Sequence, residues 1–227
     1  MFGKNIKFVN FYYKRYILNK KKTIKKIYKN LFKDKNQILE SLSKSYKDSY
    51  NKKLLHGLKK KNQFILIGMG GSILGARAIH SFLSPKFKKF IFVDEFSGKS
   101  KIKVIKKKNV NLIISKSGGT LETISNTNTL TSNQQTNIFI TENKKSYLMD
   151  LAKKLKSEVV HHNNFIGGRY SVLSEVGMLP ADLMGLNHSK FRQYNNLIKN
   201  KNFINSLLLN VSNLLDLINK KKNNSVI

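Results

Sequence analysis

The 227-residue chain contains no cysteine and no tryptophan, and the missing cysteine already excludes several classes of protein. Without cysteine there can be no disulfide framework, no thiolate nucleophile and no thiolate metal site. No segment approaches the roughly 20 consecutive apolar residues that a membrane-spanning helix needs. The first residues also lack the apolar core of a signal peptide. We therefore expect a cytoplasmic protein without a membrane partner.

Acidic residues are scarce as well, because 12 Asp and Glu stand against 43 Lys and Arg, for a formal net charge of +31. Such an excess attracts polyanions, nucleic acid among them. The lysines, however, are spread along the whole chain beside many Asn and Ile, as adenine- and thymine-rich codons would produce. Only four of the basic residues are Arg, the usual reader of base edges. We expect the charge to attract anionic ligands and do not expect specific binding of nucleic acid.

Short apolar runs that alternate with helix-like segments indicate the fold class. The runs predict buried strands, and they occupy residues 64–67, 90–93, 112–114, 138–140 and 158–160. Helical patterns lie between them, for example at residues 73–83 and 121–130. Strands that alternate with helices are typical of a parallel sheet with right-handed crossovers. The pattern predicts a doubly wound α/β domain with five parallel strands.

The flanking regions predict two further parts. Residues 1–62 are polar with Ile and Leu at near-helical spacings, especially over residues 24–58, which predicts an amphipathic helical extension. The α/β domain is expected to span residues 63–186. Residues 187–227 are predicted to begin a second domain with helices at 191–198 and 203–217. The chain ends within a new apolar run at residues 225–227, which suggests that it continues in a longer protein.

Glycines follow the first predicted strand in the string GMGGSILG, residues 68–75. Ligands of open α/β sheets bind beyond the carboxyl ends of the strands, where glycines let the backbone approach an anion. The dinucleotide fingerprint G-x-G-x-x-G fails because its last glycine is replaced by Ile73, although Asp94 stands where a ribose-binding acid would. The Walker A pattern also fails. The alternative to a ligand site is a turn that only packs helix against strand.

Hydroxyls and glycines follow the third predicted strand in the string SKSGGTLET, residues 115–123. Hydroxyl groups, exposed backbone N–H groups and the helix dipole together suit a phosphate monoester. The alternative is an ordinary helix cap, which needs only one hydroxyl, whereas this loop carries Ser115, Ser117 and Thr120. The repetition favours a ligand.

A third motif surrounds Arg169, which follows the glycine pair Gly167–Gly168. Paired glycines beside a guanidinium allow it a fixed approach to a developing oxyanion. The alternative is an ion pair between Arg169 and a surface acid such as Asp94 or Glu95. Arg is rare in this chain, so its presence here favours a geometric role.

Three strings in this order, GMGGSILG at 68–75, SKSGGTLET at 115–123 and GGRYSVLSEVG at 167–177, resemble the bacterial type of the glucose-6-phosphate isomerase (phosphoglucose isomerase) family. The resemblance covers at least residues 64–185 and implies a sugar isomerase domain. It further implies aldose–ketose isomerisation of glucose 6-phosphate and fructose 6-phosphate through a cis-enediol, with no cofactor and no metal. At full length the enzyme is expected to be a homodimer.

The same resemblance implies a role for each matching residue. It gives Arg169 the stabilisation of the enediolate and Glu122 the role of an acid that lines the site. One departure is Gly119, which stands where the family usually has Thr. The remaining contacts with phosphate and substrate fall on the hydroxyls of Ser115, Ser117 and Thr120, the backbone N–H of Lys116, and the loop residues Gly71 and Ser72.

The family's proton-abstracting Glu, in a string similar to Glu-Ser-x-Gly-Lys, has no counterpart in residues 178–227. We therefore expect the chain alone to be inactive as an isomerase. A non-catalytic sugar-phosphate-binding module and a charge-driven polyanion binder stay open as alternatives. The adjacent His161 and His162 do not predict a metal site, because neighbouring residues of a strand point to opposite faces.

Overall fold

The computed structural model describes residues 15–31, 33, 36–83, 89–96, 109–192 and 200–222. The chain divides into two compact units, one of residues 44–192 and the other of residues 1–43 with 193–227. These limits differ from the domain boundaries predicted at residues 62 and 186. Helix α3 (Lys52–Lys59) packs against α7 (Glu175–Leu183) and buries Leu58, so it belongs to the unit that contains the sheet.

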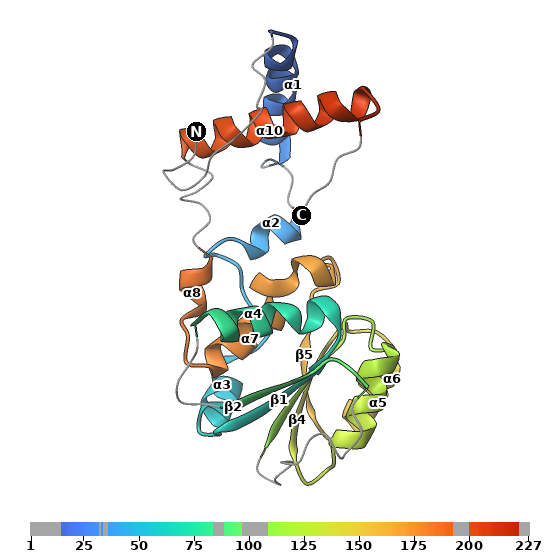
Figure 1. The fold of residues 1–227 in the computed structure, drawn as a ribbon. Helices are drawn as coiled ribbons and strands as arrows, with labels where there is room; N and C mark the ends of the chain where they lie inside the picture. The colour runs from blue at the N-terminus through green and yellow to red at the C-terminus, as the bar shows by residue number, and fades with distance from the viewer. Residues whose placement is uncertain are drawn as a thin grey trace. The chain divides into compact units, whose positions relative to one another are not determined.

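A five-stranded parallel sheet forms the centre of the larger unit (Figure 1). Its order is β2-β1-β3-β4-β5, with parallel pairing between all neighbours. The sheet confirms all five strands predicted from the apolar runs. The strands are β1 (Gln63–Gly68), β2 (Lys89–Val93), β3 (Val110–Ile114), β4 (Thr136–Thr141) and β5 (Glu158–His161).

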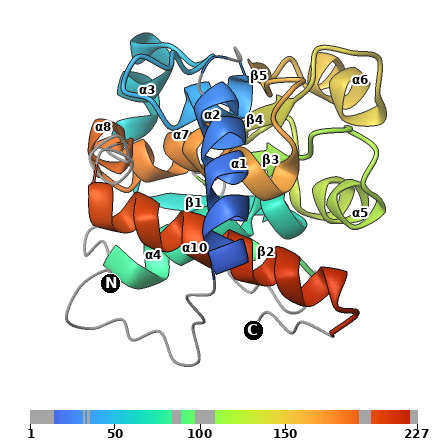
Figure 2. The ribbon, with the colours of Figure 1, turned by 90° about the horizontal axis from the view of Figure 1, so that it is seen from above.

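Helices cover both faces of the sheet, as the doubly wound class requires (Figure 2). Helices α5 (Leu121–Leu130) and α6 (Tyr147–Lys154) lie on one face, and α3, α4 (Leu74–Leu83) and α7 lie on the other. The core below α5 and α6 includes Ile65, Ile67, Ile113 and Phe139, all fully buried. Alternate residues of the same strands face the other layer, so the strands must be apolar on both sides.

The shorter elements of this unit are the 3₁₀ segments η1 (Gly70–Ser72) and η3 (Gly168–Leu173) and helix α8 (His188–Phe191). Most of the helix predicted at 191–198 lies outside the described residues. Residues 44–51 are not helical, although the spacings over 24–58 predict a helix there. The side chain of Asn51 ends this irregular stretch, because its amide oxygen accepts the Leu54 N–H at 2.8 Å and caps α3.

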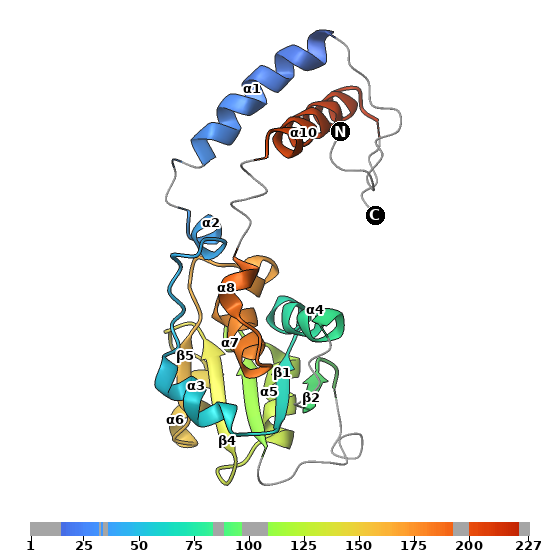
Figure 3. The same cartoon turned by 90° about the vertical axis from the view of Figure 1, so that its left-hand side faces the viewer.

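The second unit contains α1 (Arg15–Leu31), α2 (Gln37–Ser41) and α10 (Lys201–Asn219), with α1 and α10 packed together (Figure 3). Helix α10 confirms the prediction at 203–217, and Asn200 caps its start. Asp216 of α10 forms ion pairs with Lys20 at 3.6 Å and with Lys220 at 2.7 Å. None of the helices in the described part of the chain has both the length and the apolar character to cross a bilayer.

Candidate functional site

The sheet order places a topological switch point between β1 and β3. From β1 the chain goes to β2 on one side of it and then returns to β3 on the other side. The loops after β1 and β3 therefore leave neighbouring strands in opposite directions, and this is where open α/β sheets bind ligands. Gly68 pairs with Ile114 in the register of the two strands, so both loops begin at the same level. The GMGGSILG and SKSGGTLET strings occupy these two loops.

Residues 115–120, which we call the phosphate loop after the ligand predicted for them from the sequence, bring two of the predicted hydroxyls together. The Ser115 and Thr120 hydroxyl oxygens lie 2.9 Å apart and share a hydrogen bond. Ser115 is buried, and the Ser117 hydroxyl accepts the Gly119 N–H at 3.2 Å. The loop turns at Gly118, whose φ of +65° belongs to the left-handed region.

Helix α5 starts directly after this loop without a side-chain cap. Thr120 occupies the cap position, yet its hydroxyl makes no capping hydrogen bond and contacts Ser115 instead. The first N–H groups of a helix have no partner within the helix, so here they are open to an external acceptor. These hydroxyls therefore do not form an ordinary helix cap, which was the alternative to a ligand site. Glu122 lies in the first turn of α5 and is partly exposed.

Residues 162–174, which we call the Arg169 loop, pack closely on η1. A Cβ atom on Gly71 would overlap the Gly168 carbonyl and come within 2.9 Å of the Arg169 N atom. The Ser171 hydroxyl also lies 3.3 Å from the Gly71 carbonyl oxygen, its acceptor. The close approach brings the predicted residues Gly71 and Arg169 together, with Ser72 beside them in η1.

Replacing Gly71 by alanine should separate these two loops. We expect the added methyl group to lower the free energy of unfolding by about 1–3 kcal/mol, because well-packed contacts tolerate added volume poorly. Urea unfolding followed by circular dichroism measures the change. Gly57→Ala is the control, since a Cβ there meets nothing within 4 Å and alanine favours a helix. Equal stabilities for Gly71→Ala and the unmodified chain would contradict the close approach.

Arg169 itself is exposed, and the Arg ion pairs found among the described residues involve Arg77 and Arg192 instead. Asp94, the partner suggested by the alternative interpretation, pairs with Arg77 instead, with N–O distances of 2.7 and 2.8 Å. The Arg169 guanidinium is therefore not occupied by Asp94.

Three carboxyl-edge loops meet at Lys116. Its Nζ atom lies 3.2 Å from Oε1 of Glu142 and donates to the Asn164 carbonyl at 2.8 Å. Glu142 follows β4, is buried, and also pairs with Lys144. Burial alone would raise the pKa of the Glu142 carboxyl, but hydrogen bonds from Lys144 and Lys116 outweigh it and lower that pKa. Glu142 was not among the residues predicted from the sequence, although its position two residues after the predicted strand at 138–140 was a usable signal.

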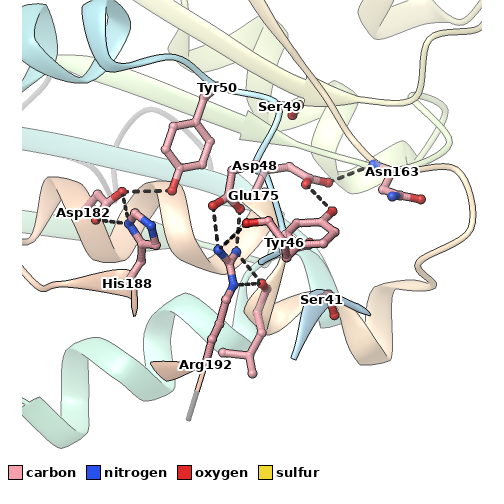
Figure 4. Close-up of polar contacts among 12 residues, drawn as sticks. Ser41, Tyr46, Asp48, Ser49, Tyr50, Asn163, Glu175, Asp182, His188 and Arg192 are labelled. Carbon is pink, nitrogen blue, oxygen red and sulfur yellow. Dashed lines mark hydrogen bonds and ion pairs between the residues drawn. The ribbon is translucent and has the colours of Figure 1, made fainter. Parts of the chain in front are cut away.

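A buried polar cluster contacts Asn163, near the start of the Arg169 loop (Figure 4). The Glu175 carboxylate, at the start of α7, accepts the Asn163 N–H at 2.8 Å and the Tyr46 hydroxyl at 3.1 Å. It lies 3.7 Å from Nδ1 of His162. Burial lowers the pKa of the His162 imidazole, so the neutral ring is favoured. Glu175 thus holds the start of the loop at Asn163 and directly follows its last residue, Ser174.

Two more acids in the same region have polar partners. Asp182 accepts the Tyr50 hydroxyl at 2.9 Å and lies 2.9 Å from Nδ1 of His188 (Figure 4). Asp48 pairs with Arg192. Among the residues that the structure describes, no group of three His, Asp or Glu side chains could hold a metal ion. The separation predicted for His161 and His162 is confirmed, with His161 exposed and His162 buried.

The sheet order and the polar loops at its switch point define a doubly wound α/β protein whose loops can receive an anion. A family model described as phosphoglucose isomerase matches residues 19–224. The chain belongs to the phosphoglucose isomerase family.

Individual relatives agree with this assignment. A glucose-6-phosphate isomerase of Methanocaldococcus jannaschii is 33% identical over 162 residues, which cover 64% of this chain and 40% of that protein. A glucose-6-phosphate isomerase of Mycoplasma genitalium is 36% identical over 142 residues, which cover 56% of this chain and 33% of that protein. The chain thus spans less than half the length of these curated relatives.

A solved structure supports the fold. A hypothetical protein from Thermus thermophilus superposes with a TM-score of 0.55 at 20% sequence identity. The superposition covers 77% of this chain and 45% of the other.

Proposed function

We propose that the chain binds glucose 6-phosphate and fructose 6-phosphate as the phosphate-binding half of an aldose–ketose isomerase. Family membership supports the reaction class. The observation that carries the residue-level proposal is the uncapped start of α5 beside the Ser115–Thr120 pair. A phosphate dianion supplies the acceptors that this arrangement lacks, and the helix dipole favours its charge.

The isomerisation moves a proton between C1 and C2 of the open sugar through a cis-enediol. The phosphate loop anchors the far end of the substrate, with hydrogen bonds from Ser115, Ser117, Thr120 and the Lys116 N–H. Gly71 and Ser72 line the chain of the sugar. Arg169, exposed at the edge of the site, stabilises the negative oxygen of the enediolate. Because only a proton moves, the reaction needs no redox cofactor.

Isothermal titration calorimetry with fructose 6-phosphate tests the binding site. We expect Ser115→Ala to weaken binding roughly 10- to 100-fold, since a hydrogen bond to a charged group contributes about 1.5–3 kcal/mol. Unphosphorylated fructose should not bind measurably. Thr129→Ala is the matched control, because Thr129 lies at the other end of α5 and, within the part of the chain that the structure describes, its hydroxyl donates to the Ser125 carbonyl. Equal affinities for Ser115→Ala and the unmodified chain would reject the phosphate loop as the site.

A second candidate function is a sugar-phosphate-binding module that does not catalyse. It is favoured by the state of Glu175 and Asp182, the acids after Arg169 in this unit, which are buried and hydrogen-bonded. Both functions predict no turnover for this chain alone, so the coding sequence downstream separates them, because an in-frame continuation with the family's Glu string favours the isomerase. Polyanion binding driven by charge would instead weaken steeply with salt and would not compete with a sugar phosphate. For an enzyme of full family length we propose a cytoplasmic homodimer.

A further inference from the structure

We infer that the side chain of Lys116 is a positioning residue, which links the phosphate loop to the Arg169 loop and so sets Arg169 relative to a bound phosphate. The inference deepens the proposed function and rests on it. The family resemblance gives Lys116 only a backbone contact, whereas the structure gives its ammonium group two partners outside its own loop.

The first partner fixes the position of the ammonium group. Glu142 has a side chain only 7% exposed, and its Oε1 atom lies 3.2 Å from Nζ of Lys116. The backbones of the two residues are also joined, because the Glu142 N–H donates to the Lys116 carbonyl at 3.1 Å. A lysine held by a buried carboxylate and by its own backbone has few alternative positions. Glu142 and Asn164 together use two of the three N–H donors of its ammonium group, which favours a structural role over a direct contact with the substrate phosphate.

The second partner transmits that position to the Arg169 loop. Nζ donates to the Asn164 carbonyl at 2.8 Å, five residues before Arg169. Asn164 and Phe165 are exposed, whereas the next residue, Ile166, is fully buried. The loop is also held at Asn163 by Glu175 and at Gly168 by the close contact with Gly71. The Lys116 hydrogen bond supplies a further point of attachment between these two and connects the loop to the phosphate-binding strand end.

The geometry separates this role from a direct contact between Lys116 and phosphate. A direct contact would affect every phosphorylated ligand equally. A positioning role changes the affinity for ligands that contact Arg169. It leaves the affinity for inorganic phosphate nearly unchanged. Two probes distinguish these cases: inorganic phosphate, and 5-phosphoarabinonate, whose carboxylate stands in for the enediolate.

The experiment titrates both probes into the full chain and its variants by calorimetry. We expect Lys116→Met to weaken 5-phosphoarabinonate about tenfold, a coupling typical of residues in one hydrogen-bond network. Inorganic phosphate should change by less than about threefold. In an Arg169→Met background, Lys116→Met should have no further effect on 5-phosphoarabinonate. Lys116→Arg, which can reach both acceptors, should restore most of the affinity.

Lys144→Met is the matched control. Lys144 pairs with the same Glu142 carboxylate and is 57% exposed, yet it has no contact with Asn164 in the described structure. It should leave both affinities nearly unchanged. If Lys116→Met does not fold, Glu142→Gln tests the same link, because it removes the charge that holds Nζ. The expected result is again a selective loss for 5-phosphoarabinonate.

The outcomes separate this inference from the proposed function. Equal losses for both probes in Lys116→Met, or a persistent effect in the Arg169→Met background, would overturn the positioning role. Ser115-dependent binding of 5-phosphoarabinonate that Lys116→Met leaves unchanged would overturn this inference alone. Absence of Ser115-dependent binding in the unmodified chain would overturn the proposed function and this inference together.

Discussion

Replacing Arg192 by methionine is expected to destabilise the sheet-containing unit by about 3–5 kcal/mol, the usual effect of removing one partner of a buried ion pair. The Arg192 guanidinium contacts both carboxylate oxygens of Asp48, at 2.7 and 2.9 Å. The two side chains are only 2% and 7% exposed. Without Arg192, the Asp48 charge would be left buried and unpaired.

Further contacts of Arg192 increase the expected effect. Nε and Nη2 donate to the Leu173 carbonyl at 3.1 and 2.7 Å, at the end of η3. The guanidinium also lies over the Tyr46 ring, with Cζ 4.9 Å from the ring centroid. Arg192 thus joins the segment at 46–48 to the C-terminal end of the Arg169 loop (Figure 4).

Arg77 and Asp94 provide the matched control for this prediction. Their pair is also bidentate, but the side chains are 38% and 24% exposed. Water screens such a pair, so Arg77→Met should change the free energy of unfolding by no more than about 1 kcal/mol. Urea unfolding of both variants measures the difference. Similar losses for the two variants would show that burial does not determine the effect.

The strands were predictable because burial on both faces requires continuous apolar runs. Ile65, Leu66 and Ile67 are all fully buried, so no polar residue interrupts β1. Helix α5 was predictable to the residue, because a hydroxyl- and glycine-rich loop precedes it. The register of parallel strands then places the loops after β1 and β3 at one edge. The neighbourhood of the candidate site therefore follows from local sequence.

Contacts between distant segments could not be predicted in the same way. Asp48 and Arg192 are 144 residues apart, and Lys116 is 48 residues from Asn164. No local sequence pattern predicts either pair, because each contact forms only when distant helices, strands and loops pack together. The spacings near residues 44–51 suggested helix, yet Asp48 and Tyr46 contact Arg192 and Glu175 from an irregular segment. Tertiary contacts thus determine the conformation of this segment.

The 227-residue chain alone is expected to bind fructose 6-phosphate without isomerising it. Loss of the general base reduces the rate roughly 10²- to 10⁴-fold. Three of the described acids, Glu142, Glu175 and Asp182, are unsuited to this role. Glu142 is bound to two lysines, which lower the pKa of its carboxyl and make it a weak base. Glu175 and Asp182 are buried and accept hydrogen bonds from neighbouring residues.

A coupled assay for the conversion of fructose 6-phosphate to glucose 6-phosphate measures the isomerase activity of the chain. A full-length family enzyme is the positive control. Calorimetry on the same preparation establishes that the substrate is bound. Turnover within the usual enzymatic range of about 1–10³ s⁻¹ would contradict the expectation. In that case Glu122→Gln decides the base, because Glu122 is the remaining family-matched acid and lies two residues beyond Thr120. If activity survives Glu122→Gln, the proton-abstracting group must be a residue of this chain that matches no catalytic residue of the family.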